Sequence, residues 1–303
     1  MAACRTVTTV HIDVPAPGSR DTTPPLGPVA FVLGGGGVLG ATQVGNLRAL
    51  IEAGIRPDLV VGTSVGALNG ALFCADPTLA GVARLEGVWH DITRSDVLGG
   101  SVLHRVATLA RHGTHLHSNA PLRALVDHHL PEARIEDLPV RFQCVAACVE
   151  TAQARWFDRG AVAPAVLASS AVPGLLPPVR IDDLHYIDGG IVQSVPVGRA
   201  VALGARTVFV LHVGRIERPL QAPRRPWEVG LVAFEVARRH QFVSTMANLP
   251  DGVSVHVLPS GDNRAPLVSM RYRDTSRVGS RIEQAHEAAA AYLVGHVTTR
   301  EGS

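Results

Sequence analysis

The chain of 303 residues contains no lysine, and all 28 of its basic residues are arginines. This absence excludes three kinds of site that depend on a lysine amine: a Walker-type phosphate loop, a Schiff-base enzyme and a serine–lysine dyad. The formal net charge is only +2, so the sequence also lacks the charge imbalance that is typical of nucleic-acid-binding proteins or of acidic tails. We therefore expect no nucleic-acid partner.

Long hydrophobic runs and paired cysteines are absent as well. No stretch contains 18 uninterrupted apolar residues, and the N-terminal residues around Arg5 include no apolar signal-peptide core. The four cysteines show neither metal-binding nor disulfide spacing, so we expect reduced, buried thiols; they are Cys4, Cys74, Cys144 and Cys148. These absences predict a cytoplasmic protein without a signal peptide or a membrane span.

What the sequence does contain is a regular alternation of apolar strand-like runs and helical segments. This alternation predicts an α/β fold of three layers, in which helices flank a central, mostly parallel sheet. With 46% hydrophobic residues, the chain can fill the core of one domain over residues 28–303. Residues 1–27 have no periodicity and predict a flexible leader. Residues 95–119 form a candidate cap, and residues 218–303 are expected as a C-terminal extension packed on the core.

The most informative stretch is Val29–Phe73, in which two strands and two helices alternate. Each strand leads into glycines: Val29–Leu33 is followed by Gly34–Gly37 and Gly40, and Leu59–Val61 is followed by Gly62–Gly66. In a parallel βαβ unit with a right-handed crossover, both strands end at the same edge of the sheet. We therefore expect the glycine loop to lie beside the turn that carries Ser64.

Ser64 lies at the centre of a G-x-S-x-G pattern, flanked by Gly62 and Gly66. This pattern is typical of a sharp strand-to-helix turn that exposes a serine hydroxyl as a nucleophile. The alternative is an ordinary serine that caps a helix. The position of the motif, between an all-apolar strand and a helix, favours the nucleophile. An α/β-hydrolase triad is disfavoured because its serine turn normally follows several strands, whereas Ser64 follows the second.

The glycine loop also fits a nucleotide-binding pattern, because Gly35, Gly37 and Gly40 satisfy G-x-G-x-x-G. A dinucleotide fold requires an acidic residue at the end of the second strand, but Asp58 stands at the beginning of that strand. The glycines therefore fit better as a cradle of backbone N–H groups for an oxyanion. A nucleotide-binding regulatory protein stays open as an alternative.

A serine nucleophile needs a base, and the chain has 14 histidines. None lies in a convincing loop after a predicted strand. Five of them cluster near the candidate cap and could bind a metal, although a polar surface is favoured: His112, His115, His117, His128 and His129. Asp188 is the better candidate for the base, because the strand Leu184–Ile187 runs directly into Asp188-Gly189-Gly190. Taken alone, this stretch would favour an ordinary Asp-Gly turn. A helix at Val197–Leu203 and a strand at Thr207–Val213 then predict another βαβ-like unit.

Taken together, these motifs resemble the patatin-like phospholipase family. Three matches carry the resemblance: the glycine loop Gly35–Gly40, the turn Gly62–Gly66, and Asp188-Gly189-Gly190. Further stretches also look similar, namely Gln43–Leu47, Ala168–Gly174 and Val195–Val197, so the likeness runs from about Val29 to Val213.

The resemblance implies a hydrolase that cleaves acyl esters of lipids with a serine–aspartate dyad, without a metal, histidine or cofactor. Ser64 would be the nucleophile, Asp188 the proton acceptor, and the backbone of Gly35, Gly36 and Gly37 the oxyanion hole. The same acyl-enzyme could serve an acyltransferase or a thioesterase. Such proteins commonly have a basic residue in the glycine loop where this chain has Leu39, which puts a preference for phospholipids in question.

A transient contact with a membrane surface is a further alternative for the helix predicted from Trp227. Apolar residues along it lie near Arg238 and Arg239, an arrangement that could rest on lipid: Trp227, Leu231, Phe234 and Val236. A helix docked on the core is favoured. The sequence does not predict the oligomeric state.

Overall fold

The computed structural model describes residues 27–94, 115–213, 220, 222–261 and 277–296. Almost all of the predicted leader lies outside these residues, as do Cys4, His112 and the candidate cap up to residue 114. Among the described helices, none is both long and apolar enough to cross a membrane.

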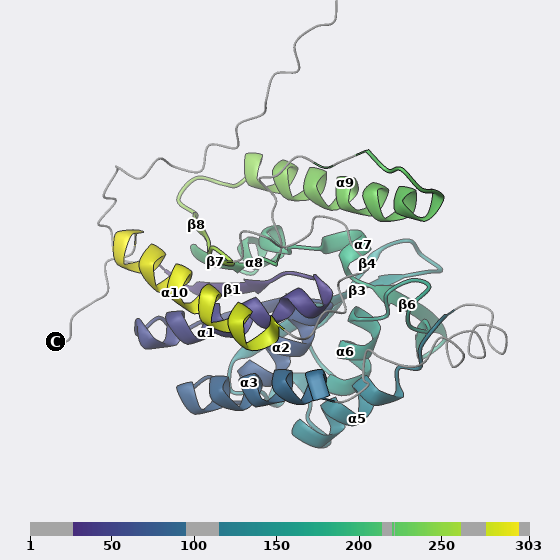
Figure 1. Cartoon of the computed structure of the whole chain (residues 1–303), viewed down its shortest axis with the longest axis horizontal. Helices are drawn as coiled ribbons and strands as arrows, with labels where there is room; N and C mark the ends of the chain where they lie inside the picture. Colours follow the sequence, from purple (N-terminus) through teal and green to yellow (C-terminus); the bar gives the residue numbers. More distant parts are fainter. Residues whose placement is uncertain (1–26, 95–114, 214–219, 221, 262–276, 297–303) are drawn as a thin grey trace, which may run out of the picture.

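A sheet of eight strands forms the centre of the fold (Figure 1), and its hydrogen-bonded order is β5-β6-β3-β2-β1-β7-β8, with β4 paired to β3. The strands are β1 (Val29–Leu33), β2 (Leu59–Thr63), β3 (Arg141–Cys148), β4 (Ala154–Phe157), β5 (Val179–Ile181), β6 (Leu184–Asp188), β7 (Thr207–Leu211) and β8 (Ser254–Val257). The run from β3 through β2, β1 and β7 to β8 is parallel, whereas β4, β5 and β6 pair antiparallel. The predicted α/β class with a mostly parallel sheet is confirmed.

Helices cover both faces of the sheet because the central strand is apolar on both sides. Along β1, Phe31 and Leu33 belong to one core cluster, and Ala30 and Val32 to the other. The first cluster is covered by α1 (Ala41–Glu52), α2 (Val65–Ala75), α3 (Leu79–Arg94), α5 (Ala120–His129), α6 (Val162–Ser169) and α10 (Val278–His296). The second is covered by α8 (Val197–Ala202) and α9 (Pro226–Ala247), which lie on the opposite side of the sheet in Figure 1.

One predicted connection is wrong. The strand that leads to Asp188 was expected to belong to a βαβ-like unit with the strand at Thr207, but β6 runs antiparallel to β3, while β7 runs parallel to β1. The short strand β5 pairs with β6 as a hairpin. The direction of β6 in the sheet depends on its pairing with the distant strand β3, and the local pattern of β6 carries no sign of that direction.

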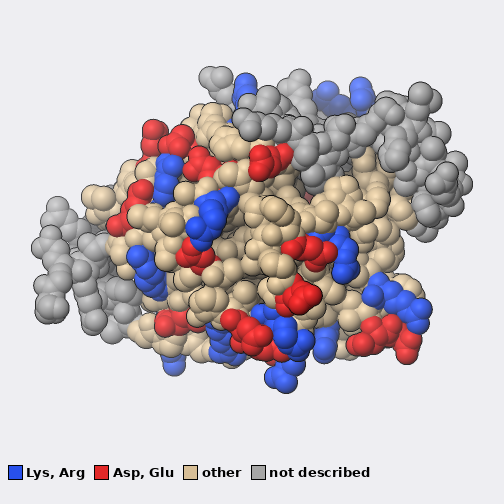
Figure 2. Space-filling view, turned by 90° about the horizontal axis from the view of Figure 1, so that it is seen from below, with Lys and Arg blue, Asp and Glu red and all other residues tan. Residues whose placement is uncertain are grey.

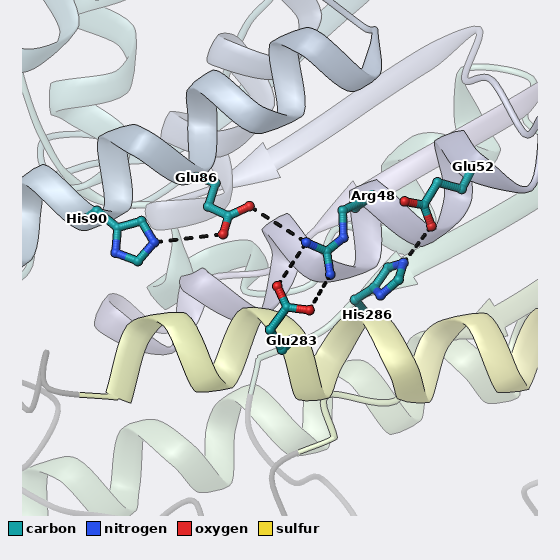
Figure 3. A network of polar contacts seen from close by, with 6 residues as sticks. All are labelled: Arg48, Glu52, Glu86, His90, Glu283 and His286. Atoms are coloured by element: carbon teal, nitrogen blue, oxygen red, sulfur yellow. Dashed lines mark hydrogen bonds and ion pairs between the residues drawn. The ribbon is translucent and has the colours of Figure 1, made fainter.

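The helix α10 packs directly on α1. A side chain at Gly45 would overlap the backbone of Ile282 in α10, so the glycine permits the close approach of the two helices. Around this contact, Arg48 donates to both carboxylate oxygens of Glu283, at 3.0 and 2.6 Å (Figure 3). His286 of α10 lies 2.5 Å from the carboxylate of Glu52 in α1. The close contact between Gly45 of α1 and Ile282 of α10 is therefore flanked by polar contacts.

The helix α9 docks on the sheet and on the turn after Asp188, as the favoured interpretation predicted. Phe242 is buried in the second core cluster, and Gln241 donates to the carbonyl of Val192 in α7 (Gly190–Gln193). Phe234 and Val236 are exposed on the same helix. The side chains of Trp227 and Leu231 lie outside the described part.

Charges of both signs are distributed over the face that Figure 2 shows, the underside of the molecule as drawn in Figure 1. Arginines and acidic residues lie side by side there instead of gathering into a patch of one sign. Surface ion pairs such as Arg123–Asp127 on α5 likewise join charges of opposite sign. The described part of this face therefore has no strong field that would attract a polyanion.

Candidate active site

Ser64 and Asp188, which are 124 positions apart in the sequence, meet in the structure. The Ser64 hydroxyl donates to Oδ2 of Asp188 at 2.5 Å. Both side chains are buried, and Asp188 is only 5% exposed. The structure thus brings together the two residues that the sequence singled out as nucleophile and base.

The register of the sheet explains this meeting. β4 covers one edge of β3 from Cys144 to Ala147. β2 and β6 therefore share the opposite edge of β3, where Thr63 pairs with Val145 and Asp188 with the next residue, Ala146. Because β6 is antiparallel to β3 and β2 is parallel to it, the two strands point at each other. Their C-terminal ends, and hence Ser64 and Asp188, must meet.

Ser64 occupies a strained turn. Its backbone has φ 56° and ψ −122°, a conformation that non-glycine residues adopt only when the surrounding structure enforces it. The turn is crowded, since a side chain at Gly62 would overlap the backbone of Gly66, and one at Gly66 would overlap the Leu33 carbonyl. Ser64 precedes α2, yet its hydroxyl makes no capping bond to that helix. The capping alternative therefore does not describe this serine.

Asp188 is held in an environment that disfavours its charge. Burial raises its pKa to about 6, even though hydrogen bonds from Ser64 and from the Gly190 N–H favour the ionised form. The following turn is tight, because a side chain at Gly189 would overlap the carbonyl of Val145. A carboxylate with such a pKa is ionised at neutral pH and can still accept a proton.

The glycine loop lies against Ser64, as predicted. A Cβ atom at Gly35 would lie 3.3 Å from the Ser64 Cβ. The N–H of Gly35 donates to the Ser194 carbonyl at 3.0 Å, so this donor is already engaged. Within the described residues, the N–H groups of Gly36 and Gly37 have no acceptor. Gly37 has φ 58°, in the left-handed region that favours glycine.

A chain of buried amides fixes the glycine loop. The side-chain amide of Gln43 donates to the carbonyls of Gly34 and Leu211, at 2.8 and 3.1 Å. Asn69 donates to Gly40 at 3.0 Å and to Gln43 at 2.8 Å, and the Trp89 indole donates to Asn69 at 3.0 Å. Sequence reasoning did not assign Asn69 or Trp89. The signal that could have found Asn69 is a polar amide inside the otherwise apolar helix α2.

Ser169 was also missed as a supporting residue. Its hydroxyl accepts the backbone N–H of Ser64 at 2.9 Å. On the other side of the turn, the Thr63 hydroxyl donates to the Gln193 carbonyl at 2.7 Å. These two bonds tie the strained turn to α6 and to the end of α7, so the hydroxyl of Ser64 keeps its direction toward Asp188.

One histidine does follow a strand directly, contrary to the interpretation of the sequence. His212 comes straight after β7, which ends at Leu211 and not at Val213. Its ring is buried and stacks on Phe242, with 6.3 Å between ring centroids, and neither ring nitrogen has a partner in the described structure. Burial, with Arg238 and Arg239 nearby, lowers the pKa of His212 well below its usual value. This neutral ring makes no hydrogen bond to the dyad.

The histidines near the candidate cap are not gathered into a metal site in the part of the chain that is described. There, no group of three histidine, cysteine or carboxylate side chains is placed to hold a metal ion. His128 and His129 contact each other edge to face, with ring centroids 4.8 Å apart. His112 lies outside the described residues.

The fold and the site define an α/β protein with a buried serine–aspartate pair and a glycine loop at one sheet edge. The family model described as patatin-like phospholipase matches residues 31–201, more than half of the chain. The chain belongs to the patatin-like phospholipase family.

Curated relatives agree with this assignment. Patatin-like phospholipase domain-containing protein 7 of Rattus norvegicus is 32% identical over 189 residues, which are 61% of this chain and 14% of the relative. Lysophospholipase nte1 of Aspergillus terreus is 30% identical over 200 residues, 62% of this chain and 12% of that protein. The chain thus matches less than a fifth of the length of these relatives.

Among solved structures, VipD from Legionella pneumophila is similar with a TM-score of 0.46 and 13% identity. That likeness covers 91% of this chain and 68% of VipD. The ExoU–SpcU complex from Pseudomonas aeruginosa gives a TM-score of 0.38 at 16% identity, over 90% of this chain and 52% of that one.

Proposed function

We propose that this chain is a serine hydrolase that cleaves acyl esters of lipids through an acyl-enzyme formed on Ser64. The observation that carries the proposal is the 2.5 Å hydrogen bond from the Ser64 hydroxyl to a buried Asp188. A nucleophile within hydrogen-bond reach of its base is the arrangement that covalent catalysis requires. The lipid substrate class is inferred from the family and from a curated relative that is named a lysophospholipase.

In the proposed reaction, Asp188 accepts the Ser64 proton while Oγ attacks the ester carbonyl carbon. The tetrahedral intermediate collapses, and the leaving alcohol takes the proton from Asp188. Water then gives a proton to Asp188 as it attacks the acyl-enzyme. The second intermediate expels Ser64, which recovers its proton, and the fatty acid leaves. The pKa of about 6 at Asp188 suits a group that accepts and returns a proton near neutral pH.

We assign the oxyanion hole to the N–H groups of Gly36 and Gly37. Both lack an acceptor in the described structure and belong to the loop that lies against Ser64. Removing one such donor typically costs about 10²–10³ in rate. The role also predicted for Gly35 would require its N–H to leave the Ser194 carbonyl. A cytoplasmic location and transfer of the acyl group to water stay predictions.

Covalent labelling tests the proposal. A fluorophosphonate should label the wild-type chain and leave Ser64→Ala unlabelled, and only the wild type should release fatty acid from a panel of phospholipids, lysophospholipids and acylglycerols. Ser170→Ala is the matched control, because this nearby buried hydroxyl has no hydrogen-bond partner in the described structure; it should label normally. A wild-type chain that is neither labelled nor active on any ester would refute the proposal.

A further inference from the structure

The end of α6 is bonded to both halves of the candidate dyad. Ser169, the last residue of α6, accepts the backbone N–H of Ser64 with its hydroxyl at 2.9 Å. The Ser169 carbonyl accepts the N–H of Gly189, the residue after Asp188, at 3.1 Å. Two residues further on, the Ala171 carbonyl accepts the N–H of Asp188 at 2.9 Å. One short segment therefore holds the nucleophile turn and the base turn together.

The two turns are held by different kinds of group. The base turn is held by main-chain carbonyls, and the end of a helix leaves such carbonyls free for partners outside it. The nucleophile turn is held by a side chain, so this bond alone depends on the type of residue. Replacing Ser169 by alanine removes the bond to Ser64 and leaves the two backbone bonds to the base turn in place.

A serine at the end of α6 is not explained by the packing of that helix. Every other residue of α6 is apolar, and the side chain of Ser169 is fully buried. A buried hydroxyl is costly unless it forms a hydrogen bond, and this one bonds the nucleophile turn. The hydroxyl of the next residue, Ser170, is also buried but has no partner in the described structure. Of these two adjacent hydroxyls, the one at Ser169 is thus joined to the site.

The turn that Ser169 holds is the strained one. Ser64 has φ 56° and ψ −122°, and a non-glycine residue keeps such a conformation only where its surroundings impose it. The same residue donates from Oγ to Asp188 at 2.5 Å. Without the bond to Ser169, the backbone of Ser64 can relax, and its hydroxyl then turns away from the carboxylate.

We propose that Ser169 is a positioning residue for the hydrolase reaction, whose hydroxyl fixes the Ser64 backbone so that Oγ stays directed at Asp188. Ser169 acts through the Ser64 backbone and takes no part in the proton transfer. This inference rests on the proposed hydrolase function and adds a residue to it. The role differs from mere stabilisation of the fold, because the hydrogen bond between nucleophile and base depends on it.

Initial rates on dihexanoylglycerol, an acylglycerol without a charged group, test this role. In Ser169→Ala, kcat should fall roughly 10- to 100-fold, the factor that corresponds to one buried donor left unpaired, while KM stays within about twofold. Ser169→Cys, whose sulfur is a weak acceptor, should lie between the alanine variant and the wild type. Ser170→Ala is the matched control, because it removes the neighbouring unpartnered hydroxyl and should keep the wild-type rate.

The pH profile separates positioning from stability. Burial raises the pKa of Asp188, whereas the hydrogen bonds from Ser64 and from the Gly190 N–H lower it. A weaker bond from Ser64 therefore raises this pKa further. The acid limb of kcat/KM in Ser169→Ala should lie roughly half a pH unit or more above that of the wild type. A side chain that only stabilised the fold would change the midpoint of denaturant unfolding and leave the acid limb in place.

A wild-type kcat in Ser169→Ala, or a lower kcat with an unmoved acid limb, would overturn the inference. If Ser169→Ala does not fold, the upward shift must appear in Ser169→Cys, and its absence there has the same consequence. An equal loss of rate in Ser170→Ala would also overturn it, because any change in this segment would then slow the enzyme. A wild-type chain that cleaves no ester and takes up no fluorophosphonate would instead count against the hydrolase proposal itself.

Discussion

Asp188 and Glu283 are both carboxylates that accept two hydrogen bonds, yet their surroundings shift the pKa in opposite directions. Asp188 is bonded by a hydroxyl and a backbone N–H, and burial raises its pKa to about 6. Glu283 is 54% exposed, and its hydrogen bonds from Arg48 lower its pKa. At Asp188, the hydrogen bonds from neutral donors do not offset the loss of hydration, so the pKa rises. At the exposed Glu283, the bonds from the cationic Arg48 outweigh that loss, so the pKa falls. The buried Asp188 carboxylate has a raised pKa, whereas the network of Figure 3 uses carboxylates to hold α10 on α1.

The strongest test of this contrast is Asp188→Asn, which keeps the shape and removes the proton acceptor. We expect turnover of any cleaved ester to fall by about 10²–10⁴-fold, the usual contribution of a general base. Initial rates on dihexanoylglycerol measure this loss. Asp183→Asn, in the same hairpin with a 95% exposed side chain, is the control. Turnover near the wild-type value in Asp188→Asn would remove this residue from the mechanism.

The same variant should gain stability while it loses activity. The folded-state pKa of Asp188 is about 6 and its ordinary value is 3.8, so the ionised side chain destabilises the fold above pH 6, and this penalty disappears as the pH falls toward 4. At pH 8, Asp188→Asn should be more stable by up to about 3 kcal/mol. Denaturant unfolding at pH 8 and pH 4 checks both ends; a gain that persists at pH 4 would show that ionisation of Asp188 is not its cause.

The glycine loop should respond differently at adjacent positions. A side chain at Gly36 would overlap Val213, whereas nothing lies within 4 Å of a Cβ atom at Gly37. Gly36→Ala should therefore displace the loop and lower kcat by about 10²–10³-fold, the effect of a lost oxyanion donor. Gly37→Ala keeps its N–H and strains only its positive φ, at about 1–2 kcal/mol of stability. Equal rates for the two variants would argue against an oxyanion role for this loop.

A smaller effect is expected from pH. Because the Asp188 carboxylate must be ionised to accept the Ser64 proton, kcat/KM should fall about tenfold per unit as the pH drops below about 6. Rates on the uncharged dihexanoylglycerol, measured between pH 4.5 and 8.5, isolate the enzyme's own titration. A profile that stays flat down to pH 5 would show that a group other than Asp188 takes the proton.

The parts that sequence predicted well are those determined by local pattern. The strands and glycine turns of the Val29–Phe73 unit appear where they were expected because each is specified within a few residues. The meeting of Ser64 and Asp188 follows from the shared edge of β3, and pairing of that kind depends on register between distant segments. Their chemical roles stay predictions until the variants are assayed.

Other features depend on contacts that no local pattern carries. The engaged N–H of Gly35 is explained only by the position of Ser194. His212 was taken as a strand residue because the apolar run continues to Val213, although β7 ends at Leu211. The role of Gly45 in admitting α10 depends likewise on the position of Ile282. For Gly35 and Gly45, the missing information is a partner more than 100 residues away.

The smallest effect is expected at the surface network. Glu283→Gln removes one ion pair between α10 and α1 while Arg48 keeps Glu86 at 3.8 Å. Exposed pairs contribute about 0.2–1 kcal/mol, so the free energy of unfolding should fall by no more than about 1 kcal/mol, and turnover should not change. Glu287→Gln, which makes the same charge change one turn along α10, controls for helix charge. Because salt screens the pair, the difference between the two variants should shrink at high ionic strength. If Glu283→Gln lowers turnover as well, the network does more than hold α10 in place, and the division between a reactive site and a structural network would not hold.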